Sequence, residues 1–227
     1  MDKESWYSVT PEGIARGIAE RCRCDLIVDG FCGVGGNAIQ FAMTCERVIA
    51  IDIDPEKIRR ARSNARVYGV EDRIEFIVGD FFKVVPNLRR AVDVVFLSPP
   101  WGGPGYLTNE IYDIRKMDGV KIFGAARQIT EHIAYYVPRN VDVNQMAALA
   151  GPGGHVKLQK NLLNGWPNAI TAYYNMAMLE RGTTILASPP KTEPNDRLRF
   201  CPYRDCKRTF STQCETVQHY RDNHVLR

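Results

Sequence analysis

This chain is organised around the segment Val92-Asp93-Val94-Val95-Phe96-Leu97-Ser98-Pro99-Pro100-Trp101-Gly102-Gly103. Its first half, rich in β-branched and aromatic residues, is typical of a buried parallel strand, and two prolines end that strand abruptly. The loop that follows has one large aromatic residue beside two glycines, which let a ligand approach the backbone. Open α/β sheets bind ligands in such loops, at the carboxyl ends of strands. Trp101 is therefore either a ring presented to a flat substrate or a residue folded back onto the core.

Short apolar strands and helical segments alternate along the rest of the chain. We expect strands at residues 26–29, 48–52, 74–78, 92–97 and 133–137, followed by an antiparallel pair at 155–161 and 170–174. We expect one helix that begins with Thr10 as its cap and a second that runs from Asp54-Pro55-Glu56 to a stop at Gly69. Two further helices are expected at residues 123–131 and 143–150. This pattern predicts an α/β fold, a Rossmann-like doubly wound sheet that is mostly parallel and ends in an antiparallel C-terminal hairpin.

Composition is that of an ordinary globular protein with room for one large core and a small addition. The chain has 227 residues, of which 44% are hydrophobic and 25% charged, and no apolar run approaches the ~18–20 residues of a membrane span. Seven cysteines without a secretory signal argue against a disulfide framework. We expect one domain over residues 1–187, a proline-rich linker over 188–199 and a small module over 200–227. The last 40 residues carry most of the net charge of +4, which is compatible with a nucleic-acid partner.

A glycine-rich loop follows the first predicted strand, in Asp29-Gly30-Phe31-Cys32-Gly33-Val34-Gly35-Gly36, and Asp52 ends the second strand. Glycines bring the backbone close to a ligand, and a carboxylate at the second strand end can bind both ribose hydroxyls. The spacing also fits a relaxed dinucleotide motif, and both acids can serve as turn or cap residues. Asp29 favours a ligand with an amine and would repel a pyrophosphate, which points to S-adenosylmethionine.

At this point the chain resembles class I S-adenosylmethionine methyltransferases, and more narrowly the trimethylguanosine synthase family. The resemblance rests, in order, on Trp6-Tyr7-Ser8-Val9-Thr10-Pro11-Glu12, the glycine loop, Val48-Ile49-Ala50-Ile51-Asp52-Ile53-Asp54-Pro55, Gly79-Asp80-Phe81, Ser98-Pro99-Pro100-Trp101-Gly102-Gly103-Pro104, Pro138-Arg139-Asn140 and Leu149-Ala150-Gly151-Pro152-Gly153-Gly154. It implies an enzyme that methylates the exocyclic N2 of a 7-methylguanosine RNA cap, which gives the 2,2,7-trimethylated cap of small nuclear and nucleolar RNAs. Capped RNA would be the partner, the nucleus the main location and the cytoplasm a second one.

The resemblance also implies roles for individual residues. The cofactor would be held by Asp29, Phe31, Gly33, Gly35, Gly36, Asp52, Asp80 and Phe81. Trp101 would stack on the methylated guanine, with Ser98, Pro99 and Asn64 around the base edge. The ribose and phosphates of the cap would contact Ser8, Thr10, Tyr106 and Arg139. Read from the residues alone, Arg139 suits a phosphate or a surface ion pair equally well.

Two departures from the family pattern keep alternatives open. Gly105 stands where the family usually has an acidic residue, and the sequence starts almost at Trp6, without the helical region that covers the cofactor in relatives. We therefore expect the pocket to be open or to be closed by another chain. The alternatives are methylation of guanine N2 within ribosomal or transfer RNA, and a non-catalytic cap-binding or RNA-binding adaptor.

The C-terminal residues have the spacing of a Cys₂His₂ zinc finger. Cys201 and Cys206 precede His219 and His224, with Phe200 and Phe210 as its small apolar core. Two cysteines from a hairpin and two histidines one helical turn apart can bind Zn²⁺ tetrahedrally, and the metal would supply most of the folding energy of a ββα module. Its helix has a weak set of base-reading residues, so RNA backbone or a protein is the expected partner.

Overall fold

The computed structural model describes residues 9–88, 92–103, 106 and 110–176, together with the backbone of two short strands, β8 (Arg199–Phe200) and β9 (Thr209–Phe210). The chain divides into two units, Met1–Ala187 and Ser188–Arg227, which are described separately. No helix in the described ranges is long and apolar enough to cross a membrane.

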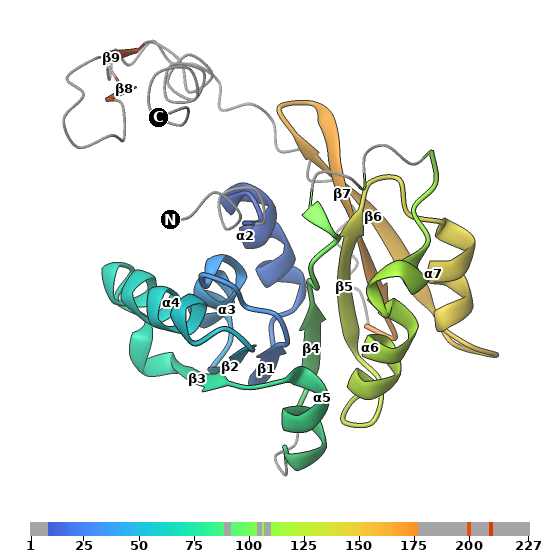
Figure 1. Cartoon of the computed structure of the whole chain (residues 1–227), viewed down its shortest axis with the longest axis horizontal. Coiled ribbons are helices and arrows are strands. Elements are labelled where there is room, and N and C mark those ends of the chain that lie inside the picture. The colour runs from blue at the N-terminus through green and yellow to red at the C-terminus, as the bar shows by residue number, and fades with distance from the viewer. Residues whose placement is uncertain are drawn as a thin grey trace. The chain divides into compact units, whose positions relative to one another are not determined.

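The first unit is built on a seven-stranded sheet (Figure 1). Its strands are β1 (Leu26–Asp29), β2 (Arg47–Asp52), β3 (Ile74–Val78), β4 (Val94–Leu97), β5 (Ile133–Pro138), β6 (Val156–Leu163) and β7 (Trp166–Tyr174). They lie in the order β3-β2-β1-β4-β5-β7-β6, and β7 runs antiparallel to both of its neighbours. The predicted mixed sheet with an antiparallel finish is confirmed. Because the chain moves outward from β1 to β3 and then returns to the other side of β1, the order reverses between β1 and β4, where such sheets bind ligands.

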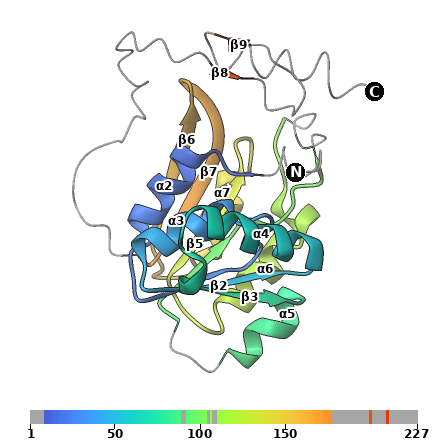
Figure 2. The ribbon, with the colours of Figure 1, turned by 90° about the vertical axis from the view of Figure 1, so that its left-hand side faces the viewer.

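Helices cover both faces of this sheet (Figures 1 and 2). One group consists of α2 (Glu12–Arg21), α3 (Gly36–Thr44) and α4 (Pro55–Val67), and the other of α5 (Phe81–Val84), α6 (Gly119–Ala126) and α7 (Val143–Leu149). Short 3₁₀ turns lie at η1 (Glu71–Arg73), η2 (Val85–Asn87) and η4 (Ile114–Met117). Alternate strand side chains therefore enter two separate cores: Phe96 and Tyr136 pack with α2–α4, whereas Leu97 and Tyr135 pack with α5–α7. Burial on both faces explains why the parallel strands are apolar throughout.

Local capping decides where the helices begin and end. The side chain of Asp54 accepts a hydrogen bond from the Glu56 backbone N–H at 2.8 Å, and Gly69 has φ +69° after α4, as predicted. The prediction of Thr10 as a cap was wrong. Pro11 is the N-cap of α2 and makes no side-chain cap bond, while the hydroxyl of Thr10 is buried and accepts a 2.9 Å hydrogen bond from Asn37 on α3.

Two predicted elements shift along the chain. The helix expected at residues 123–131 is α6, which both begins and ends earlier, at Gly119 and Ala126, and directly follows Asp118 in a left-handed conformation. The last strand begins at Trp166 instead of residue 170. Asn164 and Gly165 both have positive φ (52° and 82°) and make a two-residue turn, so the hairpin is tighter than expected.

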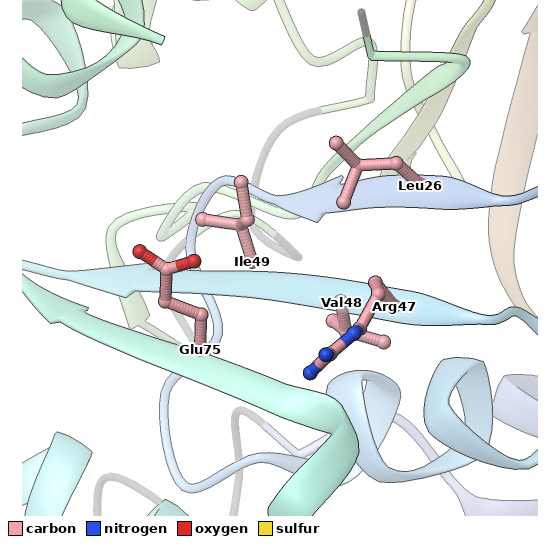
Figure 3. Close-up of a pocket in the computed structure, with 5 residues that line it drawn as sticks. All are labelled: Leu26, Arg47, Val48, Ile49 and Glu75. Atoms are coloured by element: carbon pink, nitrogen blue, oxygen red, sulfur yellow. The ribbon is translucent and has the colours of Figure 1, made fainter. Parts of the chain in front are cut away.

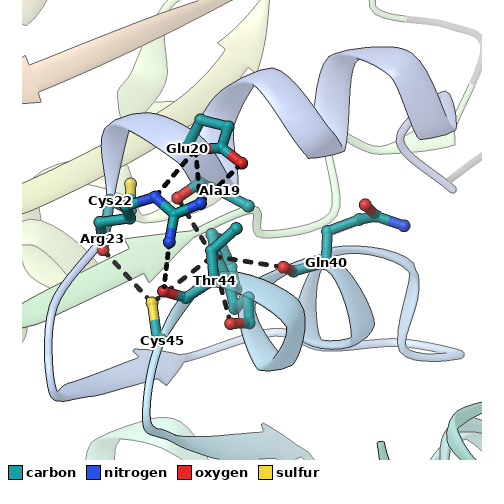
Figure 4. Close-up of polar contacts among 8 residues, drawn as sticks. Ala19, Glu20, Cys22, Arg23, Gln40, Thr44 and Cys45 are labelled. Atoms are coloured by element: carbon teal, nitrogen blue, oxygen red, sulfur yellow. Dashed lines mark hydrogen bonds and ion pairs between the residues drawn. The ribbon is translucent and has the colours of Figure 1, made fainter. Parts of the chain in front are cut away.

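The C-terminal ends of α2 and α3 are joined by polar contacts (Figure 4). The hydroxyl of Thr44 bonds the carbonyl oxygen of Ala19 on α2 at 3.3 Å, and Arg23 donates to the Thr44 carbonyl oxygen at 3.3 Å. The thiol of Cys45 contacts the Cys22 carbonyl oxygen at 3.4 Å. These contacts fix the C-terminal end of α2 against that of α3, and the hydrogen bond between Asn37 and Thr10 places the segment before α2 beside the start of α3.

Candidate active site

The predicted cofactor residues lie at or follow the carboxyl ends of β1, β2 and β3, and the predicted catalytic Ser98 follows β4. Asp29 ends β1 and Asp52 ends β2. The loop after β1 is tied to its neighbours, because the Gly33 N–H donates to the Asp52 carboxylate at 2.8 Å and the Cys32 N–H to the Ile51 carbonyl oxygen at 2.8 Å. Asn64 on α4 donates to the Val34 carbonyl oxygen at 2.8 Å. The loop is thereby held in place from β2 and from α4.

Its glycines serve different purposes. Gly33 and Gly35 have positive φ (54° and 91°), which other residues rarely adopt. A Cβ on Gly35 would lie 3.1 Å from the Cβ of Ala61, so this glycine also lets α3 and α4 pack closely. Gly36 begins α3 and faces Val9. A Cβ on Gly30 would lie 2.7 Å from the ring of Phe81, so Gly30 makes room for that ring.

Asp29 is fully buried, and only one of its two carboxylate oxygens accepts a hydrogen bond within the described ranges. One carboxylate oxygen, Oδ1, accepts a long hydrogen bond of 3.4 Å from the Phe31 N–H, and Oδ2 has no hydrogen-bond partner within the described ranges. Burial raises its pKa to about 7 and the nearby charge of Asp52 adds to this effect, whereas interactions with the backbone N–H groups of Phe31 and Ala38 lower the pKa. A buried carboxylate of this kind is costly unless a donor or a positive charge pairs with it. The unsatisfied oxygen therefore fits a ligand amine.

The other two predicted acids also organise backbone. Asp52 is half-buried and accepts hydrogen bonds from the N–H groups of Gly33 and Asp54, one on each oxygen. Asp80 accepts from the Phe82 N–H at 3.0 Å as the N-cap of α5. A carboxylate has about four lone-pair sites, so each keeps acceptor capacity for hydroxyls or an amine. For Asp52 the sequence left turn or cap chemistry open as the alternative to ligand binding, and this side chain can do both.

An aromatic layer continues from this acidic group to the Trp101 loop. The ring of Phe81 is buried and lies 5.1 Å from that of Phe31, which is half-exposed. The hydroxyl of Ser98 donates to the Phe31 carbonyl oxygen at 3.4 Å, which joins the loops after β4 and β1. Pro99 is buried behind them. The predicted cofactor residues and the Ser98-Pro99 turn are thus parts of one surface.

Trp101 is neither fully exposed nor folded into the core. Its ring is half-buried, lies 5.4 Å from the ring of Tyr136 at an interplanar angle of 32°, and meets the ring of Tyr106 edge-on at 5.2 Å. Its carbonyl oxygen accepts a 3.1 Å hydrogen bond from the Tyr112 hydroxyl. The indole is therefore fixed in position by two aromatic neighbours while part of its surface faces solvent.

Only some of the residues predicted to bind the cap lie beside this loop with exposed or accessible groups. The carbonyl oxygen of Tyr106 accepts a 3.1 Å bond from Asn140, which follows the exposed Arg139 at the end of β5. The guanidinium of Arg139 donates to the Pro167 carbonyl oxygen at 3.3 Å. Thr10 is buried, and the side chain of Asn64 is hydrogen-bonded to the glycine loop. Ser8 and the predicted zinc ligands Cys201, Cys206, His219 and His224 lie outside the described residues.

Tyr136 is a part of the site that sequence reasoning missed. It lies in the middle of β5 and reads as an ordinary core tyrosine, and burial raises the pKa of its hydroxyl above the usual value. Its neighbour Tyr135 pairs with Leu97 of β4, so Tyr136 is level with Ser98 across the sheet. Its position beside the ring of Trp101 depends on this register, and no local sequence motif predicts it.

The pocket in Figure 3 is separate from this surface. It is lined by Leu26, Arg47, Val48, Ile49 and Glu75. Leu26 and Arg47 are the first residues of β1 and β2, so the pocket lies toward the amino ends of these strands. Because ligands of open α/β sheets bind at the carboxyl ends, we do not assign it a role in the reaction.

Comparisons with known proteins agree with this geometry. A family model described as RNA cap guanine-N2 methyltransferase matches residues 24–177. Trimethylguanosine synthase of Schizosaccharomyces pombe is 39% identical over 187 residues, which cover 78% of this chain and 78% of that protein. Trimethylguanosine synthase of Saccharomyces cerevisiae is 37% identical over 186 residues, which cover 75% of this chain and 59% of that protein.

Solved structures show the same fold at low identity. A methyltransferase from Geobacter sulfurreducens has a TM-score of 0.52 at 16% identity and covers 77% of this chain and 80% of its own. The tRNA m1G37 methyltransferase of M. jannaschii has a TM-score of 0.51 at 20% identity and covers 73% of this chain and 49% of its own. With the strand-end acids, the glycine loop and the family match in agreement, the chain belongs to the RNA cap guanine-N2 methyltransferases.

Proposed function

We propose that this protein methylates the exocyclic N2 of a 7-methylguanosine RNA cap and carries the product to 2,2,7-trimethylguanosine. Two features of one surface carry the proposal. The buried Asp29 has a carboxylate oxygen without a hydrogen-bond partner among the described residues, and the indole of Trp101 is held in a fixed position. The first suits the amine of S-adenosylmethionine, and the second suits a flat cation. The family match and the two trimethylguanosine synthases support the same chemistry.

S-adenosylmethionine supplies, when bound, a methyl group on a sulfonium, which is already a strong electrophile. Asp29 and Asp52, with Asp80 beside Phe81, would hold it at the ends of β1 and β2 and on α5. Methylation at N7 gives guanine a positive charge, so its contact with the face of Trp101 gains a cation–π energy of about 2 kcal/mol when desolvated. The chain thereby selects a cap that is already methylated.

The acceptor amine is weak because its lone pair is delocalised into the ring. Ser98 and the carbonyl groups of its loop are acceptors that can bind the amine hydrogens and orient them. Ser98 is held by its bond to the Phe31 carbonyl oxygen, so its position is fixed before substrate binds. Correct placement at near-attack distance can supply most of the acceleration, and no dedicated base is assigned.

Methyl transfer to short cap analogues tests the proposal directly. We expect labelled methyl to enter a 7-methylguanosine cap dinucleotide and not its unmethylated counterpart, since only the former brings a cationic base to Trp101. Nuclease digestion and chromatography of labelled capped RNA will show whether the label is in the cap. Equal labelling of both dinucleotides would refute selection by Trp101, and label in an internal guanine would indicate ribosomal or transfer RNA methylation instead.

We also propose that residues 200–227 form a zinc finger that binds RNA or protein, and that the enzyme acts mainly in the nucleus on small nuclear or nucleolar RNAs. Antiparallel pairing of β8 with β9, with Phe200 opposite Thr209, supports the finger, because Cys201 and Cys206 lie between these two strands in the sequence, as the cysteines of such a finger do. A fluorescent fusion of the full chain tests the location.

Metal analysis of the full chain tests the finger. We expect stoichiometric zinc in the wild type and its loss in Cys201→Ser/Cys206→Ser, because two thiolates of the tetrahedral site are then removed. Cys214→Ser is the matched control, since it removes a cysteine of the same segment that is outside the proposed ligand set. Zinc retained in the double variant would contradict the assignment. The capped-RNA assay with and without a chelator then shows whether the finger contributes to activity.

A further inference from the structure

The tip of the β6–β7 hairpin presents an exposed tryptophan. Trp166 is 78% exposed, more than any other aromatic side chain in the described ranges, and Leu163, which pairs with it across the turn, is also exposed. The hairpin strands contain two lysines and no aspartate or glutamate. An aromatic side chain held in water on a basic hairpin is suited to stacking on a ligand outside the fold.

Strand register places this tip beyond the edge of the sheet that carries Trp101. Pro138, the last residue of β5, pairs with Ala169, so β7 extends three residues past it toward Trp166, or about 10 Å of extended chain. Because β5 runs parallel to β4, the tip passes the carboxyl ends of both strands (Figure 1). It is thus on the substrate side of the sheet.

The tip is also linked to the Trp101 ring through Tyr136. The ring of Tyr136 lies 5.4 Å from that of Trp101, and its hydroxyl donates to Asn168 at 2.9 Å. Asn161 pairs with Ala169 and Leu162 with Pro167, so Asn168 is the extra residue of a β-bulge and can reach across to β5. Asn168 is two residues from Trp166. The two tryptophans therefore belong to one connected framework.

Positive charge accompanies the aromatic tip. Arg139 is exposed and donates from Nη1 to the carbonyl oxygen of Pro167, the neighbour of Trp166. That contact uses one of the five donors of a guanidinium, whose planar fork matches phosphate. A positive charge beside an aromatic platform is a feature by which proteins bind single-stranded nucleic acid without reading its sequence.

We propose that the hairpin tip is a docking platform for the nucleotides that follow the cap, with a base stacked on Trp166 and a phosphate facing Arg139. The proposal rests on the proposed function, because it concerns the same RNA bound at Trp101. It makes capped RNA a better substrate than the isolated cap, and it assigns Trp166 a positioning role without contact with the reacting atoms.

Steady-state kinetics on two substrates test this platform. We expect Trp166→Ala to raise KM for a capped, unstructured RNA of about eight nucleotides by about 5- to 100-fold, with kcat retained. KM for the 7-methylguanosine cap dinucleotide is expected to stay at the wild-type value, because that substrate does not reach the tip. Trp166→Phe keeps a ring and is expected to recover most of the affinity. Tyr68→Ala, an exposed aromatic at the far end of α4, is the matched control and is expected to resemble the wild type.

Direct binding of the fluorescently labelled capped RNA separates this proposal from the proposed function. A wild type that binds the RNA more tightly than Trp166→Ala but methylates no cap dinucleotide would support the platform and overturn the function. Equal RNA affinity and equal KM in the two proteins would overturn the platform and leave the function intact. Sedimentation adds a further outcome: a wild-type dimer that Trp166→Ala dissociates, with RNA affinity unchanged, would assign the tip to a second copy of this chain and overturn the platform.

Discussion

Replacement of Trp101 by alanine is expected to lower kcat/KM for a 7-methylguanosine cap by about 100-fold. The estimate combines the cation–π energy of a desolvated methylated guanine with the stacking energy of the base. Affinity for S-adenosylmethionine is expected to stay within about twofold, because the predicted cofactor residues lie at the ends of β1 and β2, in the loop after β1 and at the start of α5, whereas Trp101 is on the loop after β4. Cap-dinucleotide kinetics and isothermal titration with the cofactor measure the two effects.

Trp101→Phe is the matched control. It keeps an aromatic ring against Tyr136 and Tyr106, and we expect part of the activity to return with the fold unchanged. Circular dichroism of both variants shows whether the half-buried indole is needed for folding. Unchanged cap kinetics in Trp101→Ala, or the loss of cofactor binding together with the fold, would assign this side chain to the core and contradict the substrate role.

Asp29→Asn is expected to weaken S-adenosylmethionine binding by about 100-fold or more. The substitution keeps the shape of the side chain but removes the charge that pairs with the ligand ammonium, and charge-assisted hydrogen bonds of this kind are worth about 1.5–3 kcal/mol before the charge pairing is added. In the wild type we expect cofactor affinity to fall about fivefold between pH 8 and pH 6, because protonation of Asp29, whose pKa without ligand is about 7, outweighs protonation of the ligand amine, whose pKa is about 8. Titration calorimetry at both pH values is the measurement. A wild-type affinity that does not fall toward pH 6 would contradict the assignment, and the variant is expected to lose this fall.

The same substitution is expected to increase stability without ligand. The folded protein binds the Asp29 proton more tightly than the unfolded chain, because burial raises the pKa from 3.8 to about 7. The stabilising contribution of this group is therefore fully present below about pH 4 and is lost as the pH rises through 7. At pH 8 we expect Asp29→Asn to exceed the wild type by about 1–3 kcal/mol in unfolding free energy, with part of the gain offset by unpaired amide hydrogens. At pH 4 the two proteins are expected to be equal, and urea denaturation at both pH values tests this.

Asp54 and Gly69 show which parts of the fold could be read from sequence. A cap, a first-turn proline and a terminal glycine each act within a few residues of the helix end, so α4 appeared with nearly its observed limits. Asp29 and Asp52 were predicted for the same reason, since each ends an apolar run. Thr10 looked like a local cap too, but its hydroxyl binds Asn37 from a different helix. The pattern could not distinguish a hydroxyl that caps its own helix from one that is buried against another.

The sequence by itself determined the order of strands and helices, the glycine loop, the acids at the strand ends and the family, because these depend on residues adjacent in the chain. The tertiary structure alone decided that Tyr136 lies beneath Trp101, that Asp29 keeps an oxygen without a hydrogen-bond partner among the described residues, and that Trp166 extends past the substrate edge. Each of these depends on register between strands or on burial by distant segments. Such quantities arise from the packing of residues far apart in sequence, so no local pattern encodes them.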